Sequence, residues 1–79
     1  MKLKKNIATS ETGFIFNPGT GDSFSVNSTG AEILNMIKEN KTRQEIFEDI
    51  VSRYDIEKSQ FERDLDDYIS LLTEYNLVD

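Results

Sequence analysis

The order of apolar and polar residues divides the chain into two parts, and the change falls near residue 27. In the first part apolar residues take alternate positions, as in strands with one buried face: Phe14, Phe16, Phe24 and Val26. Between these runs, Asn17-Pro18-Gly19 predicts a type II turn with a positive φ at the glycine. We therefore expect an antiparallel hairpin over residues 13–27, with residues 5–9 as a further short strand.

In the second part apolar residues recur every three or four positions, which predicts three helices. We expect them at about residues 29–39, at about residues 42–53, and from residues 57–59 to just before Asn76. The predicted fold class is α+β: an antiparallel hairpin or three-stranded sheet followed by three helices. This is the composition of a winged helix-turn-helix domain, with the hairpin leading instead of trailing.

The predicted helices have recognisable ends. Thr29-Gly30-Ala31-Glu32 and Thr42-Arg43-Gln44-Glu45 both match the capping box at a helix start. Asn40 and Asn76 suit the left-handed residue that follows a helix, since Asn tolerates that conformation. We expect Leu77-Val78 to fold back onto the end of the third helix.

Composition limits the chemistry. The 79 residues, which we treat as one domain over residues 1–79, contain five Phe and three Tyr, which we expect to supply much of the core. There is no Cys and no His, so disulfides, Cys/His metal sites and His-assisted nucleophilic catalysis are excluded. We expect no catalytic residue, no metal and no cofactor. The basic start lacks the apolar stretch of a signal peptide and no run is long enough to span a membrane, so we expect a cytoplasmic protein.

Charge is distributed unevenly along the chain. The net charge is -6, but residues 1–43 carry six Lys/Arg and four Asp/Glu, whereas residues 44–79 carry three and eleven. An acidic second half repels nucleic acid and suits either a basic peptide partner or a solvated surface. Asp64, Asp66 and Asp67 lack the ligand spacing of a calcium loop, which favours a solvated helix face.

The chain resembles the PqqD family, which is named for pyrroloquinoline quinone biosynthesis. Its members are also called recognition elements for ribosomally made, post-translationally modified peptides. The resemblance covers about residues 5–79 and rests on two segments, Thr20-Gly21-Asp22-Ser23-Phe24-Ser25-Val26-Asn27-Ser28-Thr29-Gly30-Ala31 and Asp64-Leu65-Asp66-Asp67-Tyr68-Ile69-Ser70-Leu71-Leu72, with Asn76-Leu77-Val78 after them. Leu34 stands where many members carry an aromatic residue, and Asn76 where many carry Gly.

The resemblance implies a non-catalytic adaptor, or peptide chaperone, that binds the leader segment of a precursor peptide. The leader would add as a strand along the third strand, with side chains in the groove beside the third helix. It would be presented to a peptide-modifying enzyme, such as a radical SAM enzyme, or to a leader peptidase. The expected peptide-binding residues are Asp22, Ser23, Phe24, Ser25, Val26, Asn27, Asp64, Asp67, Tyr68, Leu71 and Leu72.

These residues have different expected roles. Tyr68 and Leu72 would anchor apolar side chains, and Asp67 would meet a basic residue. Asp64 is either such a contact or a structural residue. Phe24 and Val26 fit the core better than a binding role, and Asn27 fits a structural role at the strand–helix junction.

Two other functions are compatible with the predicted fold. The first is a winged-helix DNA-binding module, which the acidic third helix argues against. The second is a small dimerisation module that uses the third helix or a strand edge. For the adaptor we expect no nucleic-acid or membrane partner and a monomer or weak homodimer.

Overall fold

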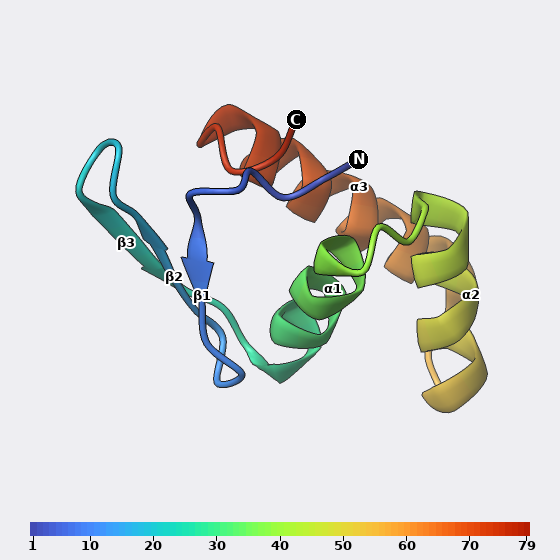
Figure 1. Ribbon diagram of the computed structural model, residues 1–79. Coiled ribbons are helices and arrows are strands. Elements are labelled where there is room, and N and C mark those ends of the chain that lie inside the picture. Colours follow the sequence, from blue (N-terminus) through green and yellow to red (C-terminus); the bar gives the residue numbers. More distant parts are fainter.

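The structure is a computed structural model that describes all of residues 1–79. Its elements, in order, are β1 (Ala8–Thr9), β2 (Phe14–Asn17), β3 (Asp22–Ser25), α1 (Ser28–Lys38), α2 (Arg43–Arg53) and α3 (Lys58–Glu74) (Figure 1). The strands form an antiparallel sheet in the order β1-β2-β3. The predicted fold class, a small antiparallel sheet followed by three helices, is therefore confirmed, and so is the short first strand.

The turn between β2 and β3 differs from the type II turn that the sequence predicted. The left-handed residue is Gly21, with φ 79°, and not Gly19. The Asn17 carbonyl accepts the Gly21 N–H at 2.8 Å, and the Asn17 side chain accepts the Gly19 N–H at 3.0 Å. A side chain that bonds backbone two residues on is a common way for Asn to build a turn. The loop thus runs over four residues and ends on Gly21.

One face of the sheet packs on the helices, and the other faces solvent. Ile15 points into the core with 1% of its surface exposed, whereas Phe14 and Phe16 are 48% and 39% exposed. Phe61 is buried, and Phe24, Phe47 and Tyr68 pack half-buried against the core, so the expectation that aromatic side chains supply much of the core is only partly confirmed: the buried core is mainly aliphatic. The physical reason is that this antiparallel sheet is covered on a single face, and the alternation places the aliphatic residue on that face.

The start of α1 also differs from the prediction. Its cap is Asn27, whose side-chain oxygen accepts the Gly30 N–H at 2.8 Å, so the predicted capping box at Thr29 is wrong. Glu32 turns instead towards α2, where it accepts hydrogen bonds from Arg53 and Tyr54.

The other predicted helix ends are confirmed. The capping box of Thr42 and Glu45 forms with bonds of 3.1 and 2.8 Å. Asn40 and Asn76 have positive φ angles of 62° and 59°. After α3 the Leu77 N–H returns to the Leu72 carbonyl at 2.9 Å, and the side chain of Leu77 is buried.

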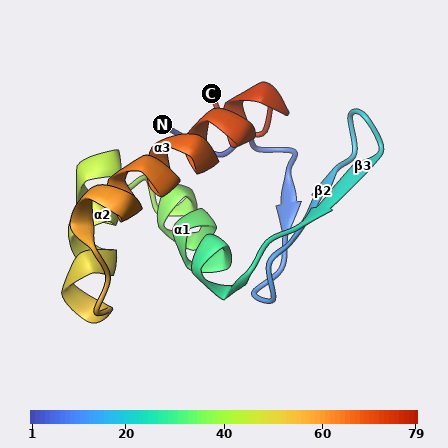
Figure 2. The same ribbon diagram turned by 180° about the vertical axis from the view of Figure 1, so that it is seen from behind.

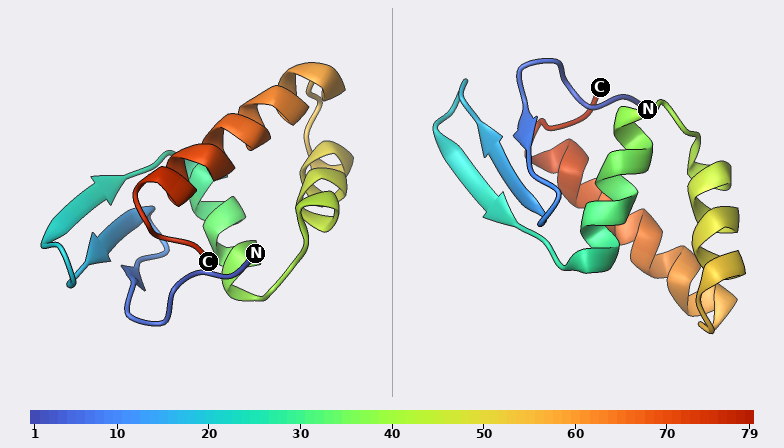
Figure 3. Two further views of the ribbon diagram at one scale, coloured as in Figure 1. Left: turned by 90° about the horizontal axis from the view of Figure 1, so that it is seen from above. Right: turned by 60° about the horizontal axis from the view of Figure 1, so that its bottom comes forward.

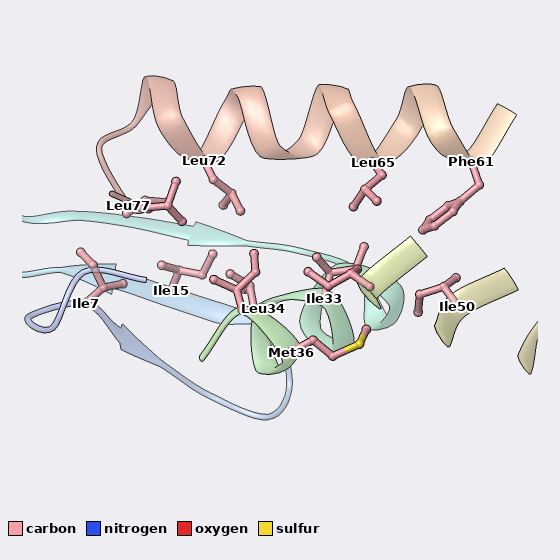
Figure 4. Packing of buried hydrophobic residues seen from close by; sticks show 13 residues of the cluster. Ile7, Ile15, Ile33, Leu34, Met36, Ile50, Phe61, Leu65, Leu72 and Leu77 are labelled. Atoms are coloured by element: carbon pink, nitrogen blue, oxygen red, sulfur yellow. The ribbon is translucent and has the colours of Figure 1, made fainter. Parts of the chain in front are cut away.

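The core lies between α3 on one side and the sheet with α1 on the other (Figure 4). Leu65 and Leu72 of α3 point towards the buried residues of α1 and Ile15 of the sheet, and Phe61 points towards α2, where it stacks with Phe47. Seen from behind, α3 extends from beside α2, across α1, to the end of the sheet (Figure 2). None of the three helices combines the length and the apolar character that a membrane crossing requires.

Candidate functional site

The strand β3 forms an open edge of the sheet. It pairs with β2 alone, and Figure 3 shows β2 and β1 following on the same side. The Val26 N–H bonds to the Gly13 carbonyl at 2.8 Å. In an antiparallel pair every second residue of a strand bonds to the neighbouring strand, and the residues between them point their backbone groups the other way. The backbone N–H and C=O groups of Ser23 and Ser25 therefore point away from β2, to the open edge.

Nothing in the sequence of this edge blocks a further strand. Natural edge strands are commonly protected by Pro, Lys or a bulge. From Asp22 to Asn27 there is no Pro and no Lys, and the register with β2 is regular. Asp22, Ser23 and Ser25 are exposed. The edge can therefore accept an extended chain through its main-chain groups.

A groove lies beside this edge, between the end of the hairpin, the start of α1 and the face of α3. Its volume is about 500 Å³. The residues that line it are Val26, Asn27, Thr29, Gly30, Ile33, Asp64, Tyr68 and Leu71. The structure thus brings together five of the residues predicted for the site: Val26, Asn27, Asp64, Tyr68 and Leu71.

Two contacts fix the walls of the groove. A Cβ atom on Gly30 would lie 3.0 Å from the Val26 Cβ, so the missing side chain lets α1 start close to the strand. The Tyr68 hydroxyl donates to the Gly30 carbonyl at 3.0 Å and so ties α3 to α1. Burial raises the pKa of Tyr68 to about 12, so the hydroxyl keeps its proton at neutral pH.

An aromatic pair extends the wall along β3. Phe24 packs on Tyr75 at the end of α3, with ring centroids 4.6 Å apart, and Tyr75 remains 46% exposed. Sequence reasoning did not place Tyr75 in the site. The available signal was its spacing, since it follows Leu71 by four residues and Tyr68 by seven on one helix face.

Leu72 does not belong to this surface. Its side chain is 2% exposed and packs in the core, so its predicted role as a peptide anchor is wrong. Leu71, the next residue back, is 45% exposed and lines the groove. The reason is helix phase, because Leu72 falls on the same face as Leu65, whereas Leu71 falls on the face of Asp64 and Tyr68.

The acidic residues of α3 divide into two groups. On the side of α2, Arg43 holds Asp66 at 2.6 Å and Glu62 at 3.7 Å. Asp64, which lines the groove, instead accepts a hydrogen bond from Gln60 at 3.0 Å and has no cationic partner. Asp67 is exposed, forms no ion pair and does not line the groove.

The fold has counterparts among solved structures. The structure titled "TbiB1 in Complex with the TbiA(beta) Leader Peptide" superposes with a TM-score of 0.92 at 24% identity, covering 100% of this chain and 95% of that one. "Lasso peptide synthetase B1 complexed with the leader peptide" gives a TM-score of 0.82 at 21% identity, covering 98% and 93%. At these identities the likeness shows a shared fold.

The sequence also matches the model of a known protein family. The family described as coenzyme PQQ synthesis protein D (PqqD) matches residues 13–78, which include every element from β2 to α3. The chain therefore belongs to the PqqD family, and the resemblance seen in the sequence is confirmed. No curated protein sequence matches the chain.

Proposed function

We propose that this protein is a non-catalytic adaptor that binds the leader segment of a ribosomally made precursor peptide. The leader adds to β3 as a fourth strand and places side chains in the groove beside α3. The observation that carries this proposal is the open backbone of Ser23 and Ser25 directly beside that groove. Membership of the PqqD family supports it, as do the two solved structures of the same fold, whose titles describe leader-peptide complexes.

The two parts of the site would contribute differently to binding. Main-chain hydrogen bonds at β3 hold any extended peptide, each with a net worth of about 0.5–1.5 kcal/mol. Selectivity comes from the groove, where Val26, Tyr68 and Leu71 offer an apolar surface and Asp64 offers a negative charge. A leader with an apolar residue facing the groove and a basic residue near Asp64 fits this arrangement.

The bound peptide would be presented to an enzyme that modifies the precursor or removes its leader. A radical SAM enzyme, a cyclodehydratase and a leader peptidase are all candidates. An adaptor of this kind needs no catalytic group of its own. No three Asp or Glu side chains converge so as to hold a metal ion.

Isothermal titration with the leader of the precursor encoded beside this gene tests the proposal. Ser25→Pro should abolish binding, because proline removes a donor that points to the open edge and places its ring where the added strand would lie. The substitution deletes no bond to β2, so the domain should keep its fold, which circular dichroism checks. Ser25→Ala is the matched control and should bind like the wild type, since the backbone N–H is retained.

The contradicting result is a folded Ser25→Pro protein that binds the leader as well as the wild type does. A gel shift with duplex DNA serves as the second control. The acidic face of α3 predicts no shift at any salt concentration. A salt-sensitive shift would instead favour a winged-helix DNA-binding module.

A further inference from the structure

Two phenylalanine rings stand exposed on the face of the sheet that points away from the helices. Phe14 is 48% and Phe16 is 39% exposed, whereas Ile15 between them is 1% exposed. The groove lies on the opposite face of the same sheet, because Val26 and Phe24 pack against the core with Ile15. Neither ring is thus part of the site described above.

The register places these rings next to the open edge. Phe14 is directly opposite Ser25, and Phe16 is directly opposite Ser23, with all four side chains on the outer face. These are non-hydrogen-bonded pairs, in which side chains approach closely. The serines are small, so they leave the rings uncovered towards the edge at which a peptide strand would add.

An added strand falls within reach of both rings. Neighbouring strands lie about 4.8 Å apart, so a strand added to β3 lies about 9.6 Å from β2. Aromatic and long side chains meet across diagonal distances of about 7–8 Å on a sheet face, and two large side chains that lean towards each other span the remaining gap of about 2 Å. A large side chain on the outer face of the peptide can therefore reach over a serine and contact a ring.

We propose that Phe14 and Phe16 form an outer clasp that binds the outward-facing side chains of the same peptide. The clasp rests on the proposed strand addition at β3. Residues of the added strand point alternately to the groove and to the outer face. With apolar surface on both faces, the site selects a peptide segment with a continuous apolar run, as in strands that are buried on both sides.

The size of the exposed surface favours a peptide over a second copy of the chain. A Phe side chain buries about 150–250 Å², so two half-exposed rings offer roughly 200 Å². A stable dimer needs about 800 Å² from each partner. The rings match one row of peptide side chains and are too small for a protein interface.

The test measures the affinity of a fluorescein-labelled leader peptide of the neighbouring precursor by fluorescence anisotropy. Phe14→Thr and Phe16→Thr remove each ring and leave a β-branched residue that suits a strand, and each should weaken binding about 3- to 10-fold. Ile56→Ala is the matched control, since Ile56 is 38% exposed on the connection between α2 and α3. It should bind within about twofold of the wild type.

Peptide variants give a second measurement that needs no change in the protein. Serine is placed at each apolar position of the leader in turn. At outward-facing positions it should weaken binding to the wild type about 3- to 10-fold and change binding to the Phe14→Thr/Phe16→Thr protein far less. At groove-facing positions it should weaken binding to both proteins equally.

The outcomes separate the clasp from the proposed function. If Ser25→Pro abolishes binding while both Phe variants bind like the wild type, the clasp is wrong and strand addition stands. If Ser25→Pro binds normally, strand addition itself is wrong. If the Phe variants change the mass seen by light scattering and leave the affinity unchanged, the rings serve self-association, and the clasp is overturned.

Discussion

At the scale of single residues, Asn27 connects the binding edge to the helices. Its side chain caps α1, and its backbone, with φ −74° and ψ 179°, is still extended. Asn is among the best cap residues, and here it directly follows Val26, whose N–H bonds to Gly13 just before β2. The sequence also contains a capping-box pattern at Thr29, and only the geometry decides between the two.

Replacing the cap tests this assignment. Asn27→Ala should lower the free energy of unfolding by about 1 kcal/mol, because the Gly30 N–H loses its acceptor. Thr29→Ala should lower the free energy of unfolding by clearly less, since no helix-capping bond from Thr29 is present. Urea unfolding of both variants provides the comparison. An equal or larger loss at Thr29 would show that the cap lies there.

Tyr68 should make stability depend on pH in the alkaline range. Burial raises its pKa to about 12 from the ordinary value of 10.0, so the folded state favours the neutral hydroxyl. The stabilisation of the fold by the neutral Tyr68 hydroxyl is therefore complete below pH 10 and is lost as the pH rises towards 12. Tyr68→Phe should be less stable at neutral pH, where it lacks the bond to Gly30, and should lose less stability above pH 10.

Urea unfolding between pH 8 and pH 12 measures this difference. The pKa of Tyr54 is also raised, by its hydrogen bond to Glu32, so only the difference between the variant and the wild type reports on Tyr68. If the free energies of unfolding of the two proteins changed in parallel with pH, Tyr68 would not be the source of the alkaline pH dependence.

At the scale of elements, α3 serves the core and the site with adjacent faces. Leu72→Ala should lower the free energy of unfolding by about 2–5 kcal/mol, because it leaves a cavity in the core. Leu71→Ala should change stability little and should weaken leader binding, because its side chain lines the groove. Urea unfolding and titration of both proteins test this pair. The reverse pattern would mean that the helix faces are assigned wrongly.

The sequence predicted the elements well and their faces less well. Periods of two and of three to four residues, with Asn40 and Asn76 as helix ends, located the hairpin strands and the helices to within one or two residues, whereas the first strand starts three residues later than predicted. Periodicity sorts residues into faces, but it does not say which face is covered. The placement of Ile15 inside and Phe14 outside depends on which face of the sheet the helices cover.

At the scale of the whole molecule, the groove depends on contacts that are distant in sequence. Gly30 and Tyr68, which bond across it, are 38 residues apart. No local pattern reports such a contact, so the residues alone could suggest an open edge but not a groove. The groove was an expectation from the family resemblance. Tyr68 and Leu71 line it, and their contact with a peptide stays a prediction, whereas Leu72, which the resemblance also placed in the site, is buried in the core.

Stability of the whole domain should also fall in acid. Hydrogen bonds lower the pKa of Glu32, through Tyr54 and Arg53, of Glu45, through Thr42, and of Glu57, through Ser59 and Gln60. A lowered carboxyl pKa stabilises the fold above the ordinary value of 4.5, and this contribution is lost as the pH falls through the folded-state value. Urea midpoints should therefore be similar at pH 7 and pH 6 and decline below about pH 4.5. A midpoint that rises in acid would contradict this.

Amide hydrogen exchange at β3, followed by NMR with and without saturating leader peptide, tests the central claim most directly. If the peptide adds to β3, the amides of Ser23 and Ser25 exchange fast in the free protein and become protected in the complex. The Val26 amide, already bonded to Gly13, serves as the internal control and is protected in both states. If the leader binds while the Ser23 and Ser25 amides stay unprotected, the peptide does not add to β3.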